Sequence, residues 1–536
     1  MKTLSPFFRI IPLVFLALTL TSCADVATST IERRPLQDSV RQLNFLEDTT
    51  TVHFENLDHN DIILVRLNQS NLIVSSENTG GVQGHLFSAQ DAEFPAPRVT
   101  ESVFTMGHSV ARAFNANPPP IREERLDFSR NASSRFVPPV VGDTRLFWVE
   151  TFTYSESWVQ RQATLRATGR HRNIWVMNEN FSTTVGSGNM ITAAQAQSLA
   201  DTFDRIYPIA TNILGFEFGG GPNSPFPGGM DGDPKIQILI YDIVDASGRI
   251  VAAGYFWAKD FFTQTELDLL GANIRTNMAE IFYLDASHIN SDPDFMYSTL
   301  IHELQHMINF NMKFLRHGLP SPAWYNEMLS MMAEDLIAPL IGISPRNPDH
   351  VIQQRVPRFL RSYYATGVAE FAPMTSPLAL ASYANVYAFG AYLVRNFGGA
   401  NLVRRILHNN TVGVASITQA LGEITPGMTF ERALARYGEA LVFGGHSMPE
   451  GVLTFDRNVR STVNGITYTA YAFNIWNMPR LGGGVGPYIF DLGQRGMRPR
   501  SVSLHSTPAW RNRSGNLSIT LVRPTDPDVI LYLMVR

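Results

Sequence analysis

Residues 302–306 read His-Glu-Leu-Gln-His, a spacing at which two imidazoles and a carboxylate can build a metal site. Residues four positions apart lie on one face of an α-helix, so His302 and His306 would converge on one point. Two imidazole nitrogens can hold a metal ion, and Glu303, the next residue, can lean over the same site as a base. The alternative is that both histidines are solvated side chains on a helix surface.

The surrounding residues predict one long helix from Asp292 to Phe314, and this favours the metal site. Asp292 can cap a helix, and Pro293 fits the first helical turn. No glycine or proline follows before Phe314, and large apolar residues recur at helical spacing. Such a helix would hold His302 and His306 in a fixed relative orientation.

A second helix is predicted over residues 324–335, which are rich in helix formers and follow a short loop with one glycine and two prolines. Glu327 stands 21 positions beyond His306, which leaves room for the chain to turn and return antiparallel. Glu327 would then complete a set of two histidines and one glutamate with a fourth position open. Glu334, two turns further on the same face, can orient a ligand histidine. The alternative for Glu327 is a surface carboxylate.

His-Glu-x-x-His followed by Asn326-Glu327 on a second helix resembles the gluzincin metallopeptidases. The fuller context, HELQHMINF with WYNEMLSMMAED, is most similar to the hyicolysin-type family of bacterial zinc peptidases. The resemblance covers residues 166–443 and is most specific over 297–335. It implies one zinc ion, a protein or peptide substrate, and hydrolysis of peptide bonds by a metal-activated water. The expected activity is that of an endopeptidase.

The resemblance also assigns roles to individual side chains. The implied zinc ligands are His302, His306 and Glu327. Glu303 would act as general base. Residues 383–398 resemble the helix that carries the transition-state tyrosine in the aminopeptidase branch of the gluzincins, so Tyr383 is predicted to donate to the oxyanion. Tyr387, one turn away, is the second candidate, and packing of both rings in a helical core is the alternative.

Predicted strands over 235–243, 251–257 and 279–285 precede the motif helix, an order that resembles the gluzincin plan. By that resemblance, residues 253–256 form an edge strand that pairs with the backbone of an extended peptide substrate. The alternative is that these residues only pack the core. In the glycine-rich loop over 219–234, two aspartates could ligate calcium, but a turn is the favoured interpretation.

The predicted fold class is α+β and multidomain. Its centre is a gluzincin-like catalytic domain, in which the active-site helix lies between a twisted β-sheet subdomain and a helical subdomain. Short strand-like segments between turn residues predict β-sandwich-like domains on both sides. The predicted boundaries are 1–22 for a lipoprotein signal peptide, 23–45 for a tether, 46–144 for an accessory β domain, 145–445 for the zinc metallopeptidase domain and 446–536 for a C-terminal β domain.

The N-terminus predicts a lipoprotein. Basic residues precede an apolar stretch over residues 10–20, which is too short for an ordinary transmembrane helix. Leu-Thr-Ser-Cys, ending at Cys23, resembles the bacterial lipobox and implies a lipid anchor in the cell envelope, at the outer membrane or cell surface. The alternative is a plain secretory signal. Cys23 is the only cysteine, so the mature protein is expected to have no disulfide and no thiolate metal site.

Composition bounds the remaining functions. A hydrophobic content of 44% with 17% charged residues predicts a folded protein with large cores. A net charge of −4 without a long basic run gives no reason to expect nucleic acid as a partner. Two other functions stay open: a catalytically inactive metallopeptidase-like lipoprotein with a binding or structural role, and zinc-dependent hydrolysis of a non-peptide bond. The intact Glu303 argues against the first of these.

Overall fold

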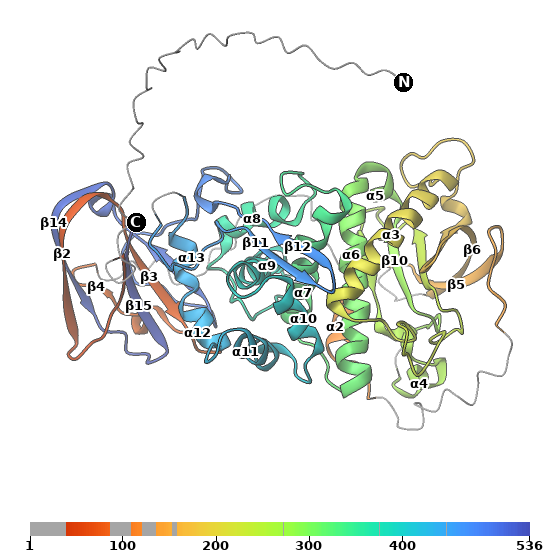
Figure 1. Ribbon diagram of the computed structural model, residues 1–536, viewed down its shortest axis with the longest axis horizontal. Coiled ribbons are helices and arrows are strands. Elements are labelled where there is room, and N and C mark those ends of the chain that lie inside the picture. Colours follow the sequence, from red (N-terminus) through yellow and green to blue (C-terminus); the bar gives the residue numbers. More distant parts are fainter. Residues whose placement is uncertain are drawn as a thin grey trace, which may run out of the picture.

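The computed structural model has a mixed α+β architecture with three regions along its long axis (Figure 1). A sheet flanked by helices lies at one end, a group of helices lies in the middle, and strands from both ends of the described chain lie at the other end. The predicted α+β class is confirmed. The structure describes residues 39–85, 109–120, 136–152, 158–271, 273–374, 376–445 and 448–536.

Six strands form the sheet at one end, and they are β5 (Thr144–Glu150), β6 (Trp158–Thr168), β7 (Arg172–Met177), β8 (Ile236–Tyr241), β9 (Gly254–Phe256) and β10 (Ile281–Asp285). Their spatial order is β5-β6-β7-β8-β10-β9. β8 pairs parallel with both β7 and β10, and all three strands are buried, which explains their nearly continuous apolar sequences. β9 pairs antiparallel with β10 and forms the edge of the sheet.

Five helices surround this sheet or lead away from it: α3 (Ala193–Leu214), α4 (Gln264–Leu269), α5 (Ala286–Ser291), α6 (Pro293–Asn309) and α7 (Ala323–Ile337). α6 contacts α3, β9 and β10 on one side and α7 on the other. Residues 298–309 of α6 are all buried, as expected for a helix enclosed by the fold.

The helix predicted over 292–314 is present, with two local differences. Asp292 stands at the N-cap position but its side chain makes no capping hydrogen bond, whereas Pro293 occupies the first turn as expected. Beyond α6 the chain continues as a π-helical turn over Phe310–Leu315. The chain then turns through a proline-containing loop into α7, so the two helices predicted from sequence lie against each other.

The middle region consists of α8 (Val351–Ser362), α9 (Ala379–Asn396), α10 (Ala400–His408), α11 (Gly413–Ile424), α12 (Phe430–Ala435) and α13 (Tyr437–Val442). α9 packs against both α7 and α8. A fully buried ion pair joins α9 to α7, with Arg395 Nη1 2.6 Å and Nη2 3.1 Å from the two carboxylate oxygens of Asp335. This bidentate pair fixes α9 beside the helix that carries Glu327.

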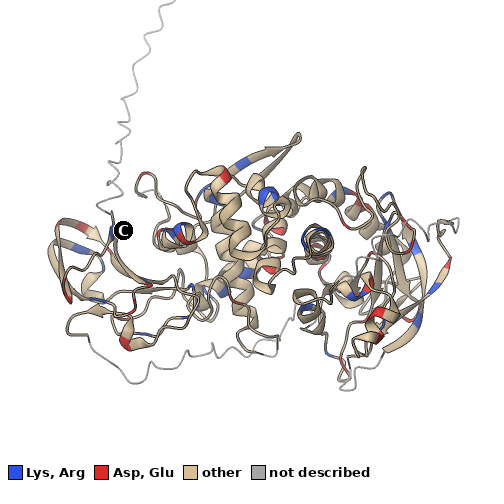
Figure 2. Cartoon of the chain, turned by 90° about the horizontal axis from the view of Figure 1, so that it is seen from below, with Lys and Arg blue, Asp and Glu red and all other residues tan. Residues whose placement is uncertain are grey.

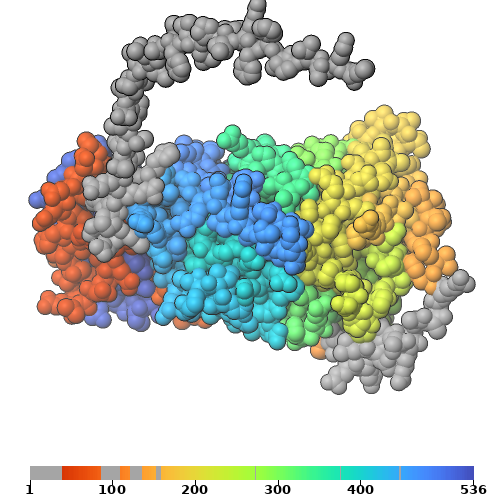
Figure 3. Space-filling model, in the orientation of Figure 1, coloured from red at the N-terminus to blue at the C-terminus, as the bar shows by residue number. Residues whose placement is uncertain are grey.

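Strands from both ends of the described chain form the third region. They are β1 (Val40–Gln42), β2 (Thr49–Asn60), β3 (Ile62–Asn68), β4 (Gly81–Val82), β13 (Val502–His505), β14 (Arg513–Val522) and β15 (Val529–Val535). One sheet has the order β1-β15-β3-β13, and the other has the order β2-β14-β4. Figure 3 shows the N-terminal and C-terminal segments side by side at this end.

This pairing differs from the predicted separate β domains over 46–144 and 446–536. β3 pairs with β15 along its whole length, and the two sheets share one apolar core that includes Phe54, Leu64 and Leu531. Each terminal segment supplies strands with an apolar face that needs a partner, and the other segment supplies that partner. The two flanking parts of the sequence therefore form one structural region.

Two more elements lie outside their predicted domains. Residues Ser109–Ala116, within the segment assigned to an accessory β domain, form the helix α2, which packs against α7. The hairpin of β11 (Val459–Val463) and β12 (Ile466–Ala470) packs against α7, α9 and α10. The helical and sheet regions around the motif helix thus include residues on both sides of the predicted 145–445 boundaries.

The aspartates of the glycine-rich loop form turns. Asp231 accepts a hydrogen bond from the backbone N–H of Asp233, and Asp233 accepts one from the backbone N–H of Lys235. The second carboxylate oxygen of Asp233 accepts hydrogen bonds from Asn173 and Gln237. These contacts use the carboxylates within the protein, in agreement with the favoured interpretation.

Buried Glu217, just before this loop, predicts a pH-dependent stability. Burial raises its pKa to about 7, although a 2.7 Å hydrogen bond from the Tyr207 hydroxyl opposes the shift. The folded state therefore binds a proton more tightly than the unfolded state, so the free energy of unfolding falls as the pH rises from about 4.5 to about 7. We expect a loss of about 3 kcal/mol over this range. Urea unfolding at several pH values measures it.

Glu217→Gln is the matched control, because a carboxamide keeps the acceptor for Tyr207 but does not titrate. The variant is expected to lack this part of the pH dependence and to exceed the wild-type stability above about pH 7. Identical pH profiles of the two proteins would contradict the assignment.

Charged residues of both signs are interspersed over the described chain (Figure 2). Within the described residues, no helix has both the length and the apolar character needed to cross a membrane.

Candidate metal centre

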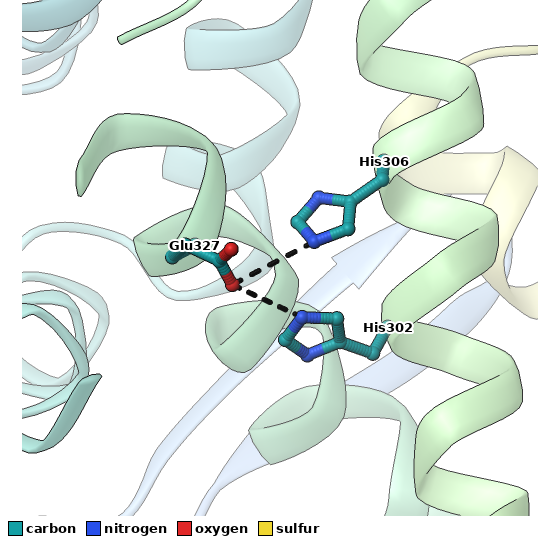
Figure 4. Close-up of side chains that lie close together, drawn as sticks. All are labelled: His302, His306 and Glu327. Atoms are coloured by element: carbon teal, nitrogen blue, oxygen red, sulfur yellow. Dashed lines mark hydrogen bonds and ion pairs between the residues drawn. The ribbon is translucent and has the colours of Figure 1, made fainter. Parts of the chain in front are cut away.

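Three side chains with metal-ligating atoms converge between α6 and α7 (Figure 4). Nε2 of His302 lies 3.1 Å, and Nε2 of His306 lies 3.6 Å, from Oε2 of Glu327. In a tetrahedral zinc site with bonds of about 2.1 Å, neighbouring ligand atoms lie about 3.4 Å apart. The observed distances therefore fit three ligands of one zinc ion. Among the described residues, no other group of three His, Cys, Asp or Glu side chains has this arrangement.

The local sequence explains why these atoms meet. His302 and His306 lie one turn apart on α6, and their rings are 4.6 Å apart at an interplanar angle of 89°. The loop with Pro320 and Pro322 returns the chain into α7, which brings Glu327 against the same face of α6. All three side chains are buried, so the cluster is held by packing rather than by flexible surface side chains.

Glu334 orients His302 from the side opposite Glu327. Its Oε1 lies 2.7 Å from Nδ1 of His302, which leaves Nε2 directed at the cluster. Burial lowers the pKa of His302, but the hydrogen bonds to Glu327 and Glu334 outweigh it and raise the pKa to about 10. In the absence of metal, a proton on His302 therefore balances charge among these buried carboxylates.

Glu327 is held as an ionised carboxylate. Burial opposes ionisation, but Arg112 of α2 and the two histidines lower the pKa of Glu327 well below its ordinary value. Nε of Arg112 donates to Oε1 of Glu327 at 2.8 Å, whereas Oε2 faces the histidines. One oxygen of Glu327 thus serves the cluster while the other is bound by an arginine.

Glu303 lies beside the cluster and not within it. Its Oε2 accepts a hydrogen bond of 2.7 Å from the backbone N–H of Phe256 in β9. Burial raises the pKa of Glu303, although the neighbouring histidines oppose the shift. Glu303, His306 and Glu327 line the same cavity together with the three residues of β9. A carboxylate with a raised pKa next to a candidate metal centre is suited to proton transfer.

The two candidate tyrosines of α9 lie in different surroundings. The Tyr383 hydroxyl accepts a hydrogen bond from Nη2 of Arg112, so one guanidinium connects Tyr383 with Glu327. Tyr387 lies beside the buried Asp335–Arg395 pair, and burial together with Asp335 raises the pKa of its phenol. The structure therefore places Tyr383, and not Tyr387, next to the candidate metal centre.

Sequence reasoning missed Arg112 and Asn115, which α2 brings into the site. Asn115 lines the same cavity as Glu303 and His306. Both residues belong to a segment that was assigned to an accessory β domain. The helix itself could have been found, because residues 109–116 contain no glycine or proline and place apolar residues on one side. The packing of this helix against α7, however, cannot be predicted from the residues of the helix alone.

Comparison with known proteins agrees with this geometry. Residues 154–462 match the peptidase M30 family, and this range includes all of α6, α7 and α9. The neutral metalloprotease ShpI of Staphylococcus hyicus is 29% identical over 224 residues, which cover 40% of this chain and 44% of the relative. The match thus spans less than half of the relative's own length. Because the family match covers more than half of the 536 residues, the chain belongs to the peptidase M30 family.

Proposed function

We propose that this protein is a zinc-dependent endopeptidase whose zinc ion is held by His302, His306 and Glu327. The observation that carries the proposal is the convergence of these three ligand atoms within 4.8 Å of one another, in a cavity that Glu303 also lines. A bound zinc ion would polarise the carbonyl of the peptide bond and make a water molecule more acidic. The family and its metalloprotease relative support a protein or peptide as substrate.

In this proposal, side chains and the edge strand carry out proton transfer, oxyanion stabilisation and substrate alignment. Glu303 accepts the proton of the attacking water and later delivers it to the leaving amine, and its raised pKa helps it to hold the proton between the two steps. Tyr383 donates to the oxyanion that develops on the carbonyl oxygen. The edge strand β9 offers backbone groups that can align an extended peptide beside Glu303.

Casein digestion by the mature protein tests the proposal. Digestion is expected to stop after treatment with a chelator and to return after zinc is added back. Bound zinc without any digestion of casein or unfolded proteins would instead favour an inactive binding protein. Hydrolysis of an ester or amide of another class, with no peptide cleaved, would favour the non-peptide hydrolase.

Tyr383→Phe is expected to lower kcat by about a hundredfold. A phenol that donates only to the developing oxyanion stabilises the transition state without helping substrate binding, so KM is expected to change little. Steady-state kinetics on a peptide substrate measure both constants. Tyr387→Phe is the control on the same helix and is expected to retain full kcat. The reverse result would move the oxyanion donor one turn along α9, and full activity of both variants would remove it from this helix.

We further propose that the chain is a lipoprotein of the bacterial cell envelope, anchored through a lipid on Cys23, which lies outside the described residues. Cys23→Ser is expected to move the protein from the detergent phase to the aqueous phase in a phase-partitioning experiment, because the lipid would be the anchor. Metabolic labelling with a fatty acid checks the modification directly. Unchanged partitioning together with unchanged labelling would contradict the lipobox interpretation.

A further inference from the structure

The helix α2 occupies the space in front of the candidate metal centre. Ala111, Arg112, Asn115 and Ala116 line the same cavity as the side chains of α6 and α7. The space left between them has a volume of about 30 Å³, which is room for about two water molecules and not for a peptide. A peptide substrate therefore does not fit between α2 and the candidate metal centre.

Asn115 binds the edge of β9 as a peptide group would. Its side-chain N–H donates to the carbonyl oxygen of Phe256 at 2.9 Å, and its side-chain oxygen accepts from the N–H of Ala258 at 2.7 Å. A carboxamide has the same donor and acceptor as a peptide bond, and added strands bind a sheet edge through such groups. Asn115 thus uses backbone groups that an extended substrate needs.

Arg112 contacts one proposed zinc ligand and the proposed oxyanion donor. Its guanidinium donates to Glu327 at 2.8 Å and to the hydroxyl of Tyr383, and it lies 4.9 Å from the centre of the Phe371 ring. Only 13% of the Arg112 side chain is exposed. A charge buried this deeply is held in place by its partners. With Arg112 in this position, a guanidinium joins the Tyr383 hydroxyl to Glu327 and occupies the space beside the candidate metal centre.

We infer that α2 is an autoinhibitory segment, which must leave the cleft before a peptide can bind. The inference rests on the proposed peptidase function. The match to the M30 family begins at residue 154, so α2 lies before the part of the chain that defines the family. The strands β2 and β3, which precede α2, remain bound to β14 and β15 through their own pairing. Displacement of α2 thus leaves the terminal sheets intact.

The test compares peptide binding in the zinc-loaded full-length protein. Glu303→Gln serves as background so that the peptide is not cleaved, and a fluorescent fragment of casein serves as probe. Arg112→Ala/Asn115→Ala in this background is expected to bind the probe at least about tenfold more tightly by fluorescence anisotropy, because the binding-competent fraction rises. Ser109→Ala, at the exposed start of α2, is the control that should not change affinity.

A second measurement tests, without any substrate, whether Asn115 protects the backbone beside β9. Asn115→Ala alone, which alters no charged group, is expected to increase amide hydrogen exchange in a peptic fragment that contains Ala258, because the N–H of Ala258 loses its acceptor. It is also expected to raise the rate of casein hydrolysis when Glu303 is intact. This variant keeps the test valid if the double substitution impairs folding.

The outcomes separate this inference from the proposed function. If the wild type hydrolyses casein but Arg112→Ala/Asn115→Ala leaves the probe affinity unchanged, autoinhibition alone is overturned. A loss of hydrolysis in Arg112→Ala with unchanged probe affinity would make Arg112 a catalytic group and would also overturn it. If no variant binds the probe and no zinc-loaded protein hydrolyses casein, both the proposed peptidase function and the autoinhibition are contradicted.

Discussion

Glu303→Gln is expected to lower kcat for peptide hydrolysis by about a thousandfold while the zinc content stays unchanged. Loss of a positioned general base costs 10²- to 10⁴-fold, about the range expected here. The carboxamide can still accept the hydrogen bond that Phe256 donates to Glu303, so the geometry of α6 and β9 is preserved. A carboxamide cannot take up a proton from water at neutral pH, and the attack on the peptide bond therefore fails.

Kinetics on a peptide substrate and metal analysis on the same sample check both halves of this expectation. Glu179→Gln, at an exposed carboxylate paired with Arg161, is the control and should behave as wild type. A Glu303→Gln variant that keeps its activity, together with a Glu327→Gln variant that is inactive but keeps its zinc, would show that the two glutamates have exchanged roles.

His306→Gln is expected to reduce the zinc content from about one ion per chain to near zero after dialysis. The variant removes one of three converging ligand atoms and places a weakly ligating carboxamide in a buried site. Glu334→Gln is the informative comparison, because Glu334 contacts His302 and lies outside the ligand set. It is expected to weaken zinc binding by about ten- to a hundredfold without eliminating it.

Metal analysis and competition with a chelator of known affinity distinguish the two effects. Retention of a full zinc ion by His306→Gln would exclude His306 as a ligand. If Glu334→Gln binds zinc as tightly as the wild type, the carboxylate of Glu334 is not needed to orient His302 for metal binding.

The local part of the site was predictable from sequence. The spacing of His302 and His306 fixed their relation on one helix, and a proline-containing loop of suitable length indicated that Glu327 returns beside them. Both inferences depend on helical periodicity and short loops, which act within a few turns of the chain. Tyr383 needed the resemblance to a family, because nothing in its immediate sequence separates it from Tyr387.

The long-range part was not predictable in the same way. The strand patterns at the two ends were recognised, but alternation of apolar residues does not say which strand pairs with which. Arg112 illustrates the same limit, since its partners Glu327 and Tyr383 lie 215 and 271 residues away. The sequence around Arg112 gives no sign that this side chain makes a buried contact with the carboxylate of Glu327.

The pairing of the two ends also sets an order in which the chain can fold. Thr51 and Thr520, whose hydroxyls lie 2.9 Å apart across the β2–β14 pair, are separated by 469 residues. At ordinary rates of translation, the second partner emerges on the order of a minute after the first. The helices α6, α7 and α9 make their contacts within a much shorter stretch, so they can assemble before the terminal sheets. The unpaired edges of β2 and β3 must meanwhile stay apart from those of other nascent chains, until β14 and β15 pair with them and complete the terminal sheets.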